Sequence, residues 1–376
     1  MTRGLLAVTG KGGNMSYRNL RAVCLSAFLV LSLVWSSGAT KLAGEFLATG
    51  FGAKALGMGG AFVSIADDAS AVYWNPAGLH QLDRRQALVM HSQRFGGMVD
   101  YSTFSFAMPL SREEGAEATG AIGLVWLRVS DIALTSHLNT PGVDFIDERD
   151  PETGQPNGKW DPGERRLWDP DRVRWESDHE IAGFLSYSRR VWENTAVGFN
   201  AKLIWKELAE ISCLGFGLDA ALLHRLTPNW NVGINIQDFT TTPLYWDGWY
   251  YDADSPSGKY KVSTTETINP SLKLGTSYRL PIAAISGDVV LAADTDFKFE
   301  GLEEEEADFS FSEVSGDVRL GAMYEYNRML RVAVGMDRQK PSAGIGLTVS
   351  QFDLDYAFWR DAELDNTHRI SVSMDF

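Results

Sequence analysis

Alternation between apolar and polar residues recurs along most of this chain and limits it to one class of secondary structure. Across 367–376, the residues His368, Ile370, Val372, Met374 and Phe376 fall on one face, with polar residues between them. A period of two is the period of a β-strand, and a helical stripe cannot produce it. The same pattern returns at 271–279, 288–298, 317–326, 330–337 and 352–358. The chain is therefore predicted to be all-β.

Fourteen candidate strands can be counted, each about ten residues long, which is the length that a tilted strand needs to cross a bilayer. They start near residues 86, 101, 119, 179, 195, 214, 229, 269, 288, 315, 329, 341, 351 and 367.

The connections between these strands are sorted by length. Those after odd-numbered strands include long ones, near 130–178, 238–268 and 299–314, whereas those after even-numbered strands are short. A soluble sandwich has no reason to sort its loops in this way. A transmembrane barrel has short periplasmic turns at one end and long outer loops at the other. The prediction is an all-β membrane protein, a 14-stranded antiparallel transmembrane β-barrel.

The polar face of the strands separates this prediction from the alternative of a secreted two-sheet protein, whose strands would also alternate. That face carries charges of both signs, which suit a closed lumen: Asp288, Asp294, Asp296, Lys298, Asp317, Arg319, Arg331, Asp353, Asp355 and Arg369. The apolar face would then meet lipid. Aromatic residues near strand ends are predicted to form interfacial girdles: Tyr101, Trp126, Trp192, Trp205, Trp230, Tyr278, Tyr326 and Trp359.

The N-terminus has the layout of a secretory signal peptide. Arg18 and Arg21 precede a mostly apolar run over 22–35, and Ser37-Gly38-Ala39 supplies small residues for cleavage. The predicted organisation is a signal peptide at 1–39, a plug segment at 40–85 and a barrel at 86–376. A single membrane anchor is the alternative for the first segment, and Met15 is an alternative start.

The segment 40–85 is rich in glycine and other small residues. Gly50-Phe51-Gly52 and Gly57-Met58-Gly59-Gly60 resemble phosphate-binding loops only loosely, because no Gly-Lys-Ser/Thr follows them. We expect a compact segment with one short helix over Asp67–Tyr73 and a tight turn at Asn75-Pro76. Small residues would let this backbone thread a confined space.

Two runs in this segment carry a family resemblance. The run at 52–63, Gly-Ala-Lys-Ala-Leu-Gly-Met-Gly-Gly-Ala-Phe-Val, and the run at 66–79, Ala-Asp-Asp-Ala-Ser-Ala-Val-Tyr-Trp-Asn-Pro-Ala-Gly-Leu, resemble the N-terminus of PorV/PorQ proteins. These proteins are a branch of the FadL-like outer-membrane barrels, and the segments 238–243, 354–358 and 366–372 resemble the family as well.

The resemblance implies a fourteen-stranded barrel in the outer membrane of a Gram-negative-type bacterium, with 40–85 as an N-terminal hatch that plugs it. Asn75, Pro76 and Ala77 would form the fixed bend of this hatch. The aromatic C-terminus, Phe376, is expected to serve as the signal for the barrel assembly machinery. Outer-membrane lipid is the other expected partner.

Two roles follow from the resemblance. The first is a non-catalytic accessory of type IX-like secretion that handles exported cargo proteins at the outer membrane. The alternative is a FadL-like transporter of hydrophobic small molecules. A structural barrel with no open path would also fit the charged lumen.

Enzymatic and nucleic-acid functions find little support in the residues. No Gly-x-Ser-x-Gly elbow occurs, and the six histidines lack metal-ligand spacing. The net charge of −15 argues against nucleic-acid binding, which needs a basic face. We expect no enzyme and no cofactor.

Two predicted outer loops carry candidate sites. The acidic loop 144–171 matches a calcium loop weakly at Asn157, Asp161 and Glu164, but carboxylates are missing at the first two ligand positions. A hydrated acidic loop is the simpler interpretation. The loop within 238–268 is a candidate contact for a ligand or partner, or an interfacial anchor, because it is strongly aromatic: Tyr245, Trp246, Trp249, Tyr250 and Tyr251.

Overall fold

The computed structural model describes residues 43–111, 113, 117–134, 173–251, 259–282, 286–299, 308–311, 314–360 and 366–376. The predicted signal peptide at 1–39 and the candidate calcium loop at 144–171 lie outside these residues. In the described part of the chain, no helix has the length and apolarity needed to cross a membrane.

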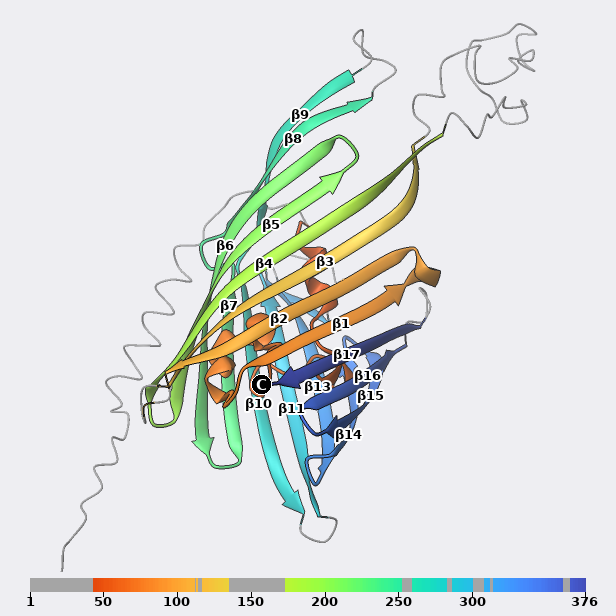
Figure 1. The fold of residues 1–376 in the computed structure, drawn as a ribbon. Helices are drawn as coiled ribbons and strands as arrows, with labels where there is room; N and C mark the ends of the chain where they lie inside the picture. The colour runs from red at the N-terminus through yellow and green to blue at the C-terminus, as the bar shows by residue number, and fades with distance from the viewer. Residues whose placement is uncertain are drawn as a thin grey trace, which may run out of the picture. The chain divides into compact units, whose positions relative to one another are not determined.

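The wall is a closed antiparallel barrel of fourteen strands (Figure 1). These are β1 (Gln86–Arg94), β2 (Val99–Ser111), β3 (Ala118–Leu134), β4 (Arg174–Trp192), β5 (Thr195–Leu208), β6 (Ile211–Thr227), β7 (Trp230–Gln237), β10 (Ser271–Ile282), β11 (Gly287–Lys298), β13 (Val314–Tyr326), β14 (Leu330–Asp337), β15 (Lys340–Val349), β16 (Phe352–Trp359) and β17 (Thr367–Asp375). Each strand pairs with the next, and β17 pairs with β1 from Asp375↔Gln86 to His368↔Gln93. The predicted strand count is confirmed, and every predicted start lies within five residues of the observed one.

The two ends of the barrel differ as the loop lengths predict. We call the end where the Phe376 amide donates to the Arg85 carbonyl (2.9 Å) the turn end. The short connections β2–β3, β4–β5, β6–β7, β10–β11, β13–β14 and β15–β16 lie there, and they follow every second strand of the wall. We call the opposite end the loop end. It holds the long connection between β3 and β4 and a short 3-10 turn, η3 (Phe95–Gly97), between β1 and β2.

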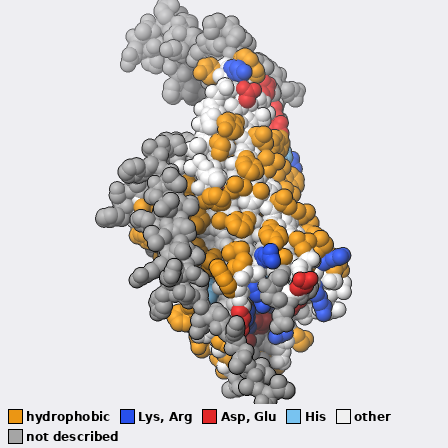
Figure 2. Space-filling view, turned by 90° about the vertical axis from the view of Figure 1, so that its left-hand side faces the viewer, with side chains coloured by type: hydrophobic (Ala, Val, Ile, Leu, Met, Phe, Trp, Pro, Cys, Tyr) orange, Lys and Arg blue, Asp and Glu red, His pale blue; other side chains and the backbone are white. Residues whose placement is uncertain are grey.

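The apolar series of each strand faces outward. Val89, Leu185, Leu203, Leu320 and Val334 are all exposed, although they are large and apolar. Figure 2 shows such side chains covering the middle of the wall, with most charged ones above and below them. The ladder leaves no open edge around the wall, so the backbone is paired where lipid would surround it. An apolar band on a closed barrel is the outer surface of a bacterial outer-membrane protein.

The segment predicted as a long loop at 238–268 is largely strand. β8 (Thr242–Tyr251) pairs with β6 from Gly215↔Leu244 to Ile211↔Gly248. β7 pairs with the other half of β6 on the same side, so β8 continues the line of β7 toward the loop end. β9 (Lys259–Ile268) pairs with β8 and leads into β10. The loop prediction was wrong because apolar and aromatic residues crowd this segment without a period of two.

β7 and β8 are separated by a short irregular stretch. Asp238 and Thr241 both have left-handed backbone (φ 53° and 57°), which ends the regular ladder of β7. Besides β8 and β9, one more strand lies outside the fourteen-strand wall in the described part of the chain. This strand, β12 (Phe309–Phe311), pairs with the start of β13 at the loop end.

Residues 43–85 lie inside the barrel and form four short helical turns. These are η1 (Glu45–Thr49), α2 (Ala53–Gly57), α3 (Ala71–Trp74) and η2 (Pro76–Gln81). The helix expected over 67–73 is shorter and begins later, because the Asp68 carboxylate accepts the amide and the hydroxyl of Ser70 and so holds the chain in a turn. We call residues 43–85 the plug.

Candidate functional site

The bend of the plug is fixed by one buried asparagine. The Asn75 side-chain oxygen accepts the Ala77 amide (3.0 Å), while its Nδ2 donates to the carbonyls of Val63 (2.8 Å) and Leu222 (3.2 Å). Pro76 starts η2, where a missing N–H costs nothing. The structure thus brings the predicted bend residues Asn75, Pro76 and Ala77 together and ties them to the plug and to β6.

Inward-facing glycines of the wall give the plug room. A Cβ on Gly198 would lie 2.1 Å from the Ala77 amide nitrogen, and one on Gly335 would lie 2.1 Å from the Met58 carbonyl carbon. Sequence reasoning missed these positions. The available signal was a glycine on the inward series of a strand, which often marks a close approach of another backbone.

The variant Gly198→Ala is expected to displace the bend, because the added methyl group has no space beside the Ala77 backbone. We expect a loss of about 3 kcal/mol in plug docking. Amide hydrogen exchange across 75–81 should speed up accordingly. The matched control is Gly183→Ala, since a Cβ at Gly183 meets nothing within 4 Å. Equal exchange in the two variants would contradict the close contact.

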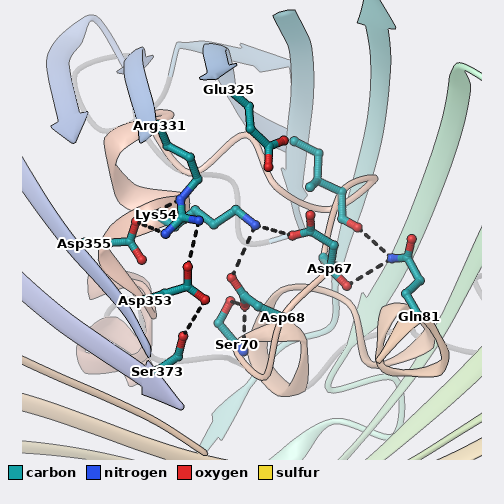
Figure 3. A network of polar contacts seen from close by, with 12 residues as sticks. Lys54, Asp67, Asp68, Ser70, Gln81, Glu325, Arg331, Asp353, Asp355 and Ser373 are labelled. Atoms are coloured by element: carbon teal, nitrogen blue, oxygen red, sulfur yellow. Dashed lines mark hydrogen bonds and ion pairs between the residues drawn. The ribbon is translucent and has the colours of Figure 1, made fainter. Parts of the chain in front are cut away.

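The centre of the plug holds an ion-pair cluster (Figure 3). Lys54 Nζ lies 2.7 Å from an Asp67 oxygen and 3.8 Å from an Asp68 oxygen. Burial opposes the charge on Lys54, but the two carboxylates outweigh it and raise the pKa of Lys54. Burial likewise opposes the charge on Asp67, yet Lys54 holds the pKa of Asp67 below its usual value. These contacts stay within the plug.

The wall beside this cluster carries its own pairs. Arg331 lies 2.8 Å from an Asp353 oxygen and 3.0 Å from an Asp355 oxygen, and Asp353 also accepts from Ser373 (3.4 Å) (Figure 3). The pocket between α2 and these strands has a volume of about 10 Å³, no more than one water molecule needs. Plug and wall are therefore closely packed here.

A second cluster fastens the junction between β7 and β8. Lys202 lies 2.9 Å from Asp219 and 2.7 Å from Asp238, and Thr242 donates to Asp238. All four side chains are buried. A third group joins Lys273 and Arg319 to Asp296 (3.2 and 3.4 Å). The charged set predicted to line the lumen does face inward.

The inner wall carries few charges on β1, β2 and β3. Most inward side chains there are small, apolar or hydroxyl-bearing: Leu88, Met90, Tyr101, Thr103, Ser105, Ala107, Ala121 and Val125. The buried ion pairs lie instead on β4–β6 and on β10–β16.

His80 in η2 should make plug docking sensitive to acid. Its Nδ1 lies 2.8 Å from the Ala77 carbonyl oxygen, and burial, with Arg190 and Arg225 nearby, lowers the pKa of His80 below 6.5. The pKa of His80 is lower in the docked plug than in the undocked chain. Protonation of His80 therefore favours the undocked state, and docking weakens as the pH falls through the pKa of the undocked histidine. Exchange of the amides at 76–81, corrected for intrinsic rates, should be faster at pH 5 than at pH 7.

The matched variant for this pH test is His80→Gln, which cannot titrate. It should show the same corrected exchange at both pH values. An equal acid response in the variant and the natural chain would mean that His80 is not the sensor.

The aromatic residues predicted in one loop are divided between the two faces of β8. Tyr245 and Trp249 face outward and are 60% and 47% exposed. Trp246 points inward and donates to Glu266 (3.0 Å). It packs with the buried cluster that contains Phe46, Leu244 and Ile204. The side chains of Tyr250 and Tyr251 lie outside the described part of the structure.

Six of the eight predicted girdle residues are exposed, five of them at or near strand ends and Trp126 in the middle of β3, but Tyr101 and Trp359 are not exposed. Tyr101 is buried and donates to the Gly50 carbonyl (3.0 Å), and Trp359 stacks on Arg369. The prediction was wrong for these two residues because a filled lumen needs large side chains against its plug. Phe376 is exposed at the turn end and meets the Phe106 ring edge-on at 6.5 Å. Its reading by an assembly machinery stays a prediction.

No cluster of three or more potential ligands occurs among the described residues, and the calcium candidates Asn157, Asp161 and Glu164 lie outside them.

Comparison with known proteins gives the fold but no sequence family. No protein-family model and no curated protein matches the chain. Among solved structures, the Ralstonia pickettii toluene transporter TbuX matches with a TM-score of 0.52 and 13% identity, over 87% of this chain and 98% of that one. The P. putida toluene transporter TodX matches with a TM-score of 0.52 and 13% identity, over 87% and 99%.

A Pseudomonas aeruginosa FadL homologue matches with a TM-score of 0.50 and 13% identity, over 90% of this chain and 99% of that one. Identities this low establish the shared fold alone. Together with the closed wall and its apolar outer band, they make this chain a plugged, fourteen-stranded outer-membrane β-barrel of the FadL-like fold, from a Gram-negative-type bacterium.

Proposed function

We propose that this protein is a non-catalytic outer-membrane channel for hydrophobic small molecules. The observation that carries the proposal is the shared architecture. The same barrel, matched over nearly the whole length of both chains, serves proteins described as toluene transporters. The alternative role stated from the sequence thus has better support than the handling of exported cargo.

The close packing of the plug against the wall means that a transported molecule needs the plug to move. Because plug and wall meet with almost no open space around α2, a molecule the size of toluene can pass there only when the plug shifts. Three buried cations would keep their ion pairs during such a shift. Lys54 is paired within the plug, whereas Lys202 and Arg331 are paired within the wall.

The contacts between plug and wall are mostly neutral hydrogen bonds. Ser371 accepts the Ala53 amide (3.2 Å), Ser342 donates to the Gly57 carbonyl (3.2 Å), and Asn235 donates to the Trp74 carbonyl (2.9 Å). Each such bond contributes on the order of 1 kcal/mol net. The plug is thus held by many exchangeable contacts, which suits a movable element.

Uptake of labelled toluene tests the proposal. Cells that carry the protein in their outer membrane should take up toluene faster than cells with an empty vector, and uptake of glucose should be unchanged. Equal toluene uptake at verified levels of folded barrel would contradict the proposal.

Handling of exported cargo is a second candidate, carried by the exposed outward face of β8. Tyr245 and Trp249 are large, accessible aromatic side chains near the loop end, and such residues are frequent in binding surfaces. Loss of a secreted protein from the medium when both are changed to Ser, with toluene uptake retained, would favour this role. The resemblance to PorV/PorQ proteins rests on the N-terminal motifs and on the segments 238–243, 354–358 and 366–372.

A further inference from the structure

One buried arginine in the lumen differs from the other buried basic residues. Six Lys and Arg residues are buried among the described residues, and five of them lie within 3.5 Å of a carboxylate oxygen: Lys202, Lys206, Lys273, Arg319 and Arg331. The sixth, Arg369 on β17, is only 2% exposed. Within the described ranges, no carboxylate pairs with it and its Nε and Nη1 have no hydrogen-bond partner.

Two further buried donors lack acceptors beside Arg369. Ser92 on β1 lies directly across the ladder from Arg369, and the Trp359 ring lies 4.6 Å from the Arg369 guanidinium carbon. The Ser92 hydroxyl and the Trp359 Nε1 also have no partner among the residues that the structure describes. Three neighbouring side chains on β1, β16 and β17 therefore present unused donors in one buried place.

A second guanidinium lies near Arg369. Arg94 follows Ser92 on the same inward series and lies close enough to repel Arg369. The Arg94 guanidinium donates to Thr49 Oγ1 of the plug (3.3 Å) and stacks on Phe95 at 5.0 Å. The nearby carboxylate of Asp337 is already bound to Arg319 (2.9 Å).

These donors lie on the loop-end side of α2. Ser371, the next inward residue of β17 toward the turn end, accepts from Ala53 at the start of α2. Arg369 is one step nearer the loop end than Ser371, and Arg94, one step farther still, contacts Thr49 of the plug.

A buried cation without a counterion is strongly unfavourable. For this reason, removal of the anionic partner from a buried ion pair lowers protein stability considerably. A folded chain that keeps this arrangement is therefore suited to receive an anion. A carboxylate has two acceptor oxygens, pairs well with a guanidinium and can also accept from an indole N–H and a hydroxyl. The positive charge of Arg369 and two neutral donors, the Trp359 Nε1 and the Ser92 hydroxyl, match a singly charged group.

We propose that Arg369, Trp359 and Ser92 form a binding site for one carboxylate group at the loop end of the lumen. The further step, that this carboxylate is the head group of a transported hydrophobic molecule, rests on the proposed function. The site selects among hydrophobic molecules, admitting those with an anionic end more readily than their neutral counterparts.

The test compares benzoate with toluene, which share a ring and differ in the carboxylate. Binding is measured by titration calorimetry on the full chain in a non-ionic detergent at pH 7.5. Benzoate should bind the natural chain more tightly than toluene. Arg369→Gln should weaken benzoate binding tenfold or more, because a charge-assisted hydrogen bond is lost, and should change toluene binding less than twofold. Trp359→Phe should weaken benzoate binding about threefold.

The matched charge control is Arg279→Gln, since Arg279 is paired with Asp288 and Glu325 near the turn end. It should leave benzoate binding unchanged. Arg369→Lys keeps the charge and should retain more benzoate binding than Arg369→Gln. Retained toluene binding in each variant shows that the barrel is folded.

Equal benzoate affinity in Arg369→Gln and the natural chain would overturn the site. A triple variant, Asp361→Asn with Glu363→Gln and Asp365→Asn, tests whether carboxylates of the chain itself are the occupants. Benzoate binding that occurs only in this triple variant would also overturn the proposal. Toluene uptake without benzoate binding would defeat the anion site alone. Arg369-dependent benzoate binding without toluene uptake would support the site and defeat the proposed function.

Discussion

A disulfide between the plug and the wall should stop the passage of toluene. In the variant Val72→Cys with Gly123→Cys, a Cβ at position 123 would lie 2.8 Å from the place that Val72 Cγ2 now occupies. A sulfur in that place is close to the geometry that a disulfide requires. Residue 72 lies in α3 of the plug and residue 123 on the inward series of β3, so the bond would fasten the two bodies together.

Oxidation of this double variant should lower toluene uptake at least tenfold, because the proposed path beside α2 opens only when the plug shifts, and reduction should restore uptake. Each single-cysteine variant serves as a control for the altered packing. Uptake that persists in the fully oxidised variant would mean that molecules pass without movement of the plug.

Removal of the buried charge of Lys202 should have the largest effect on stability. Lys202 is 2% exposed and stands between Asp219 and Asp238, which are also buried. Lys202→Met would leave two carboxylates without their cation in a site that excludes water. We expect the free energy of unfolding to fall by about 3–5 kcal/mol. Denaturant titration of the refolded barrel measures it.

The matched control for this prediction is Lys261→Met on the exposed β9. Lys261 lies 3.5 Å from Asp247, but both side chains are more than half exposed. An exposed pair of this kind contributes less than about 1 kcal/mol. A triple variant that also changes Asp219 and Asp238 to Asn should recover much of the loss. Equal effects of Lys202→Met and Lys261→Met would contradict the buried cluster.

The sequence predicts the wall well, because its period of two survives in nearly every strand. Each side chain on a transmembrane strand meets either lipid or the lumen, so polarity reports orientation directly. The same period places Tyr101 with Thr103 and Ser105, and Trp359 with Asp355 and Ala357, on the inward series. The girdle prediction considered only the distance of a residue from the strand end and not its inward position, and it was wrong for Tyr101 and Trp359.

The sequence predicts β8 and β9 poorly for a physical reason. These strands extend past the loop end, and β8 carries aromatic residues on both faces, so polarity no longer reports its orientation. Register is also invisible in a single sequence. The pairing of Lys202 with both Asp219 and Asp238 depends on the alignment of β5 with β6 and on the irregular stretch after β7. The lack of a partner for Arg369 could be seen only once its neighbours were placed.

The most direct test of the whole account is the environment of the outward residues in a bilayer. Nitroxide labels at Leu203 and Leu320 should be reached by oxygen, which dissolves in lipid, and shielded from a water-soluble nickel chelate. A label at Asp247, on the exposed side of β8, should show the reverse. If the nickel chelate reaches Leu203 and Leu320 as readily as Asp247, the apolar face does not meet lipid and the plugged transmembrane barrel is contradicted.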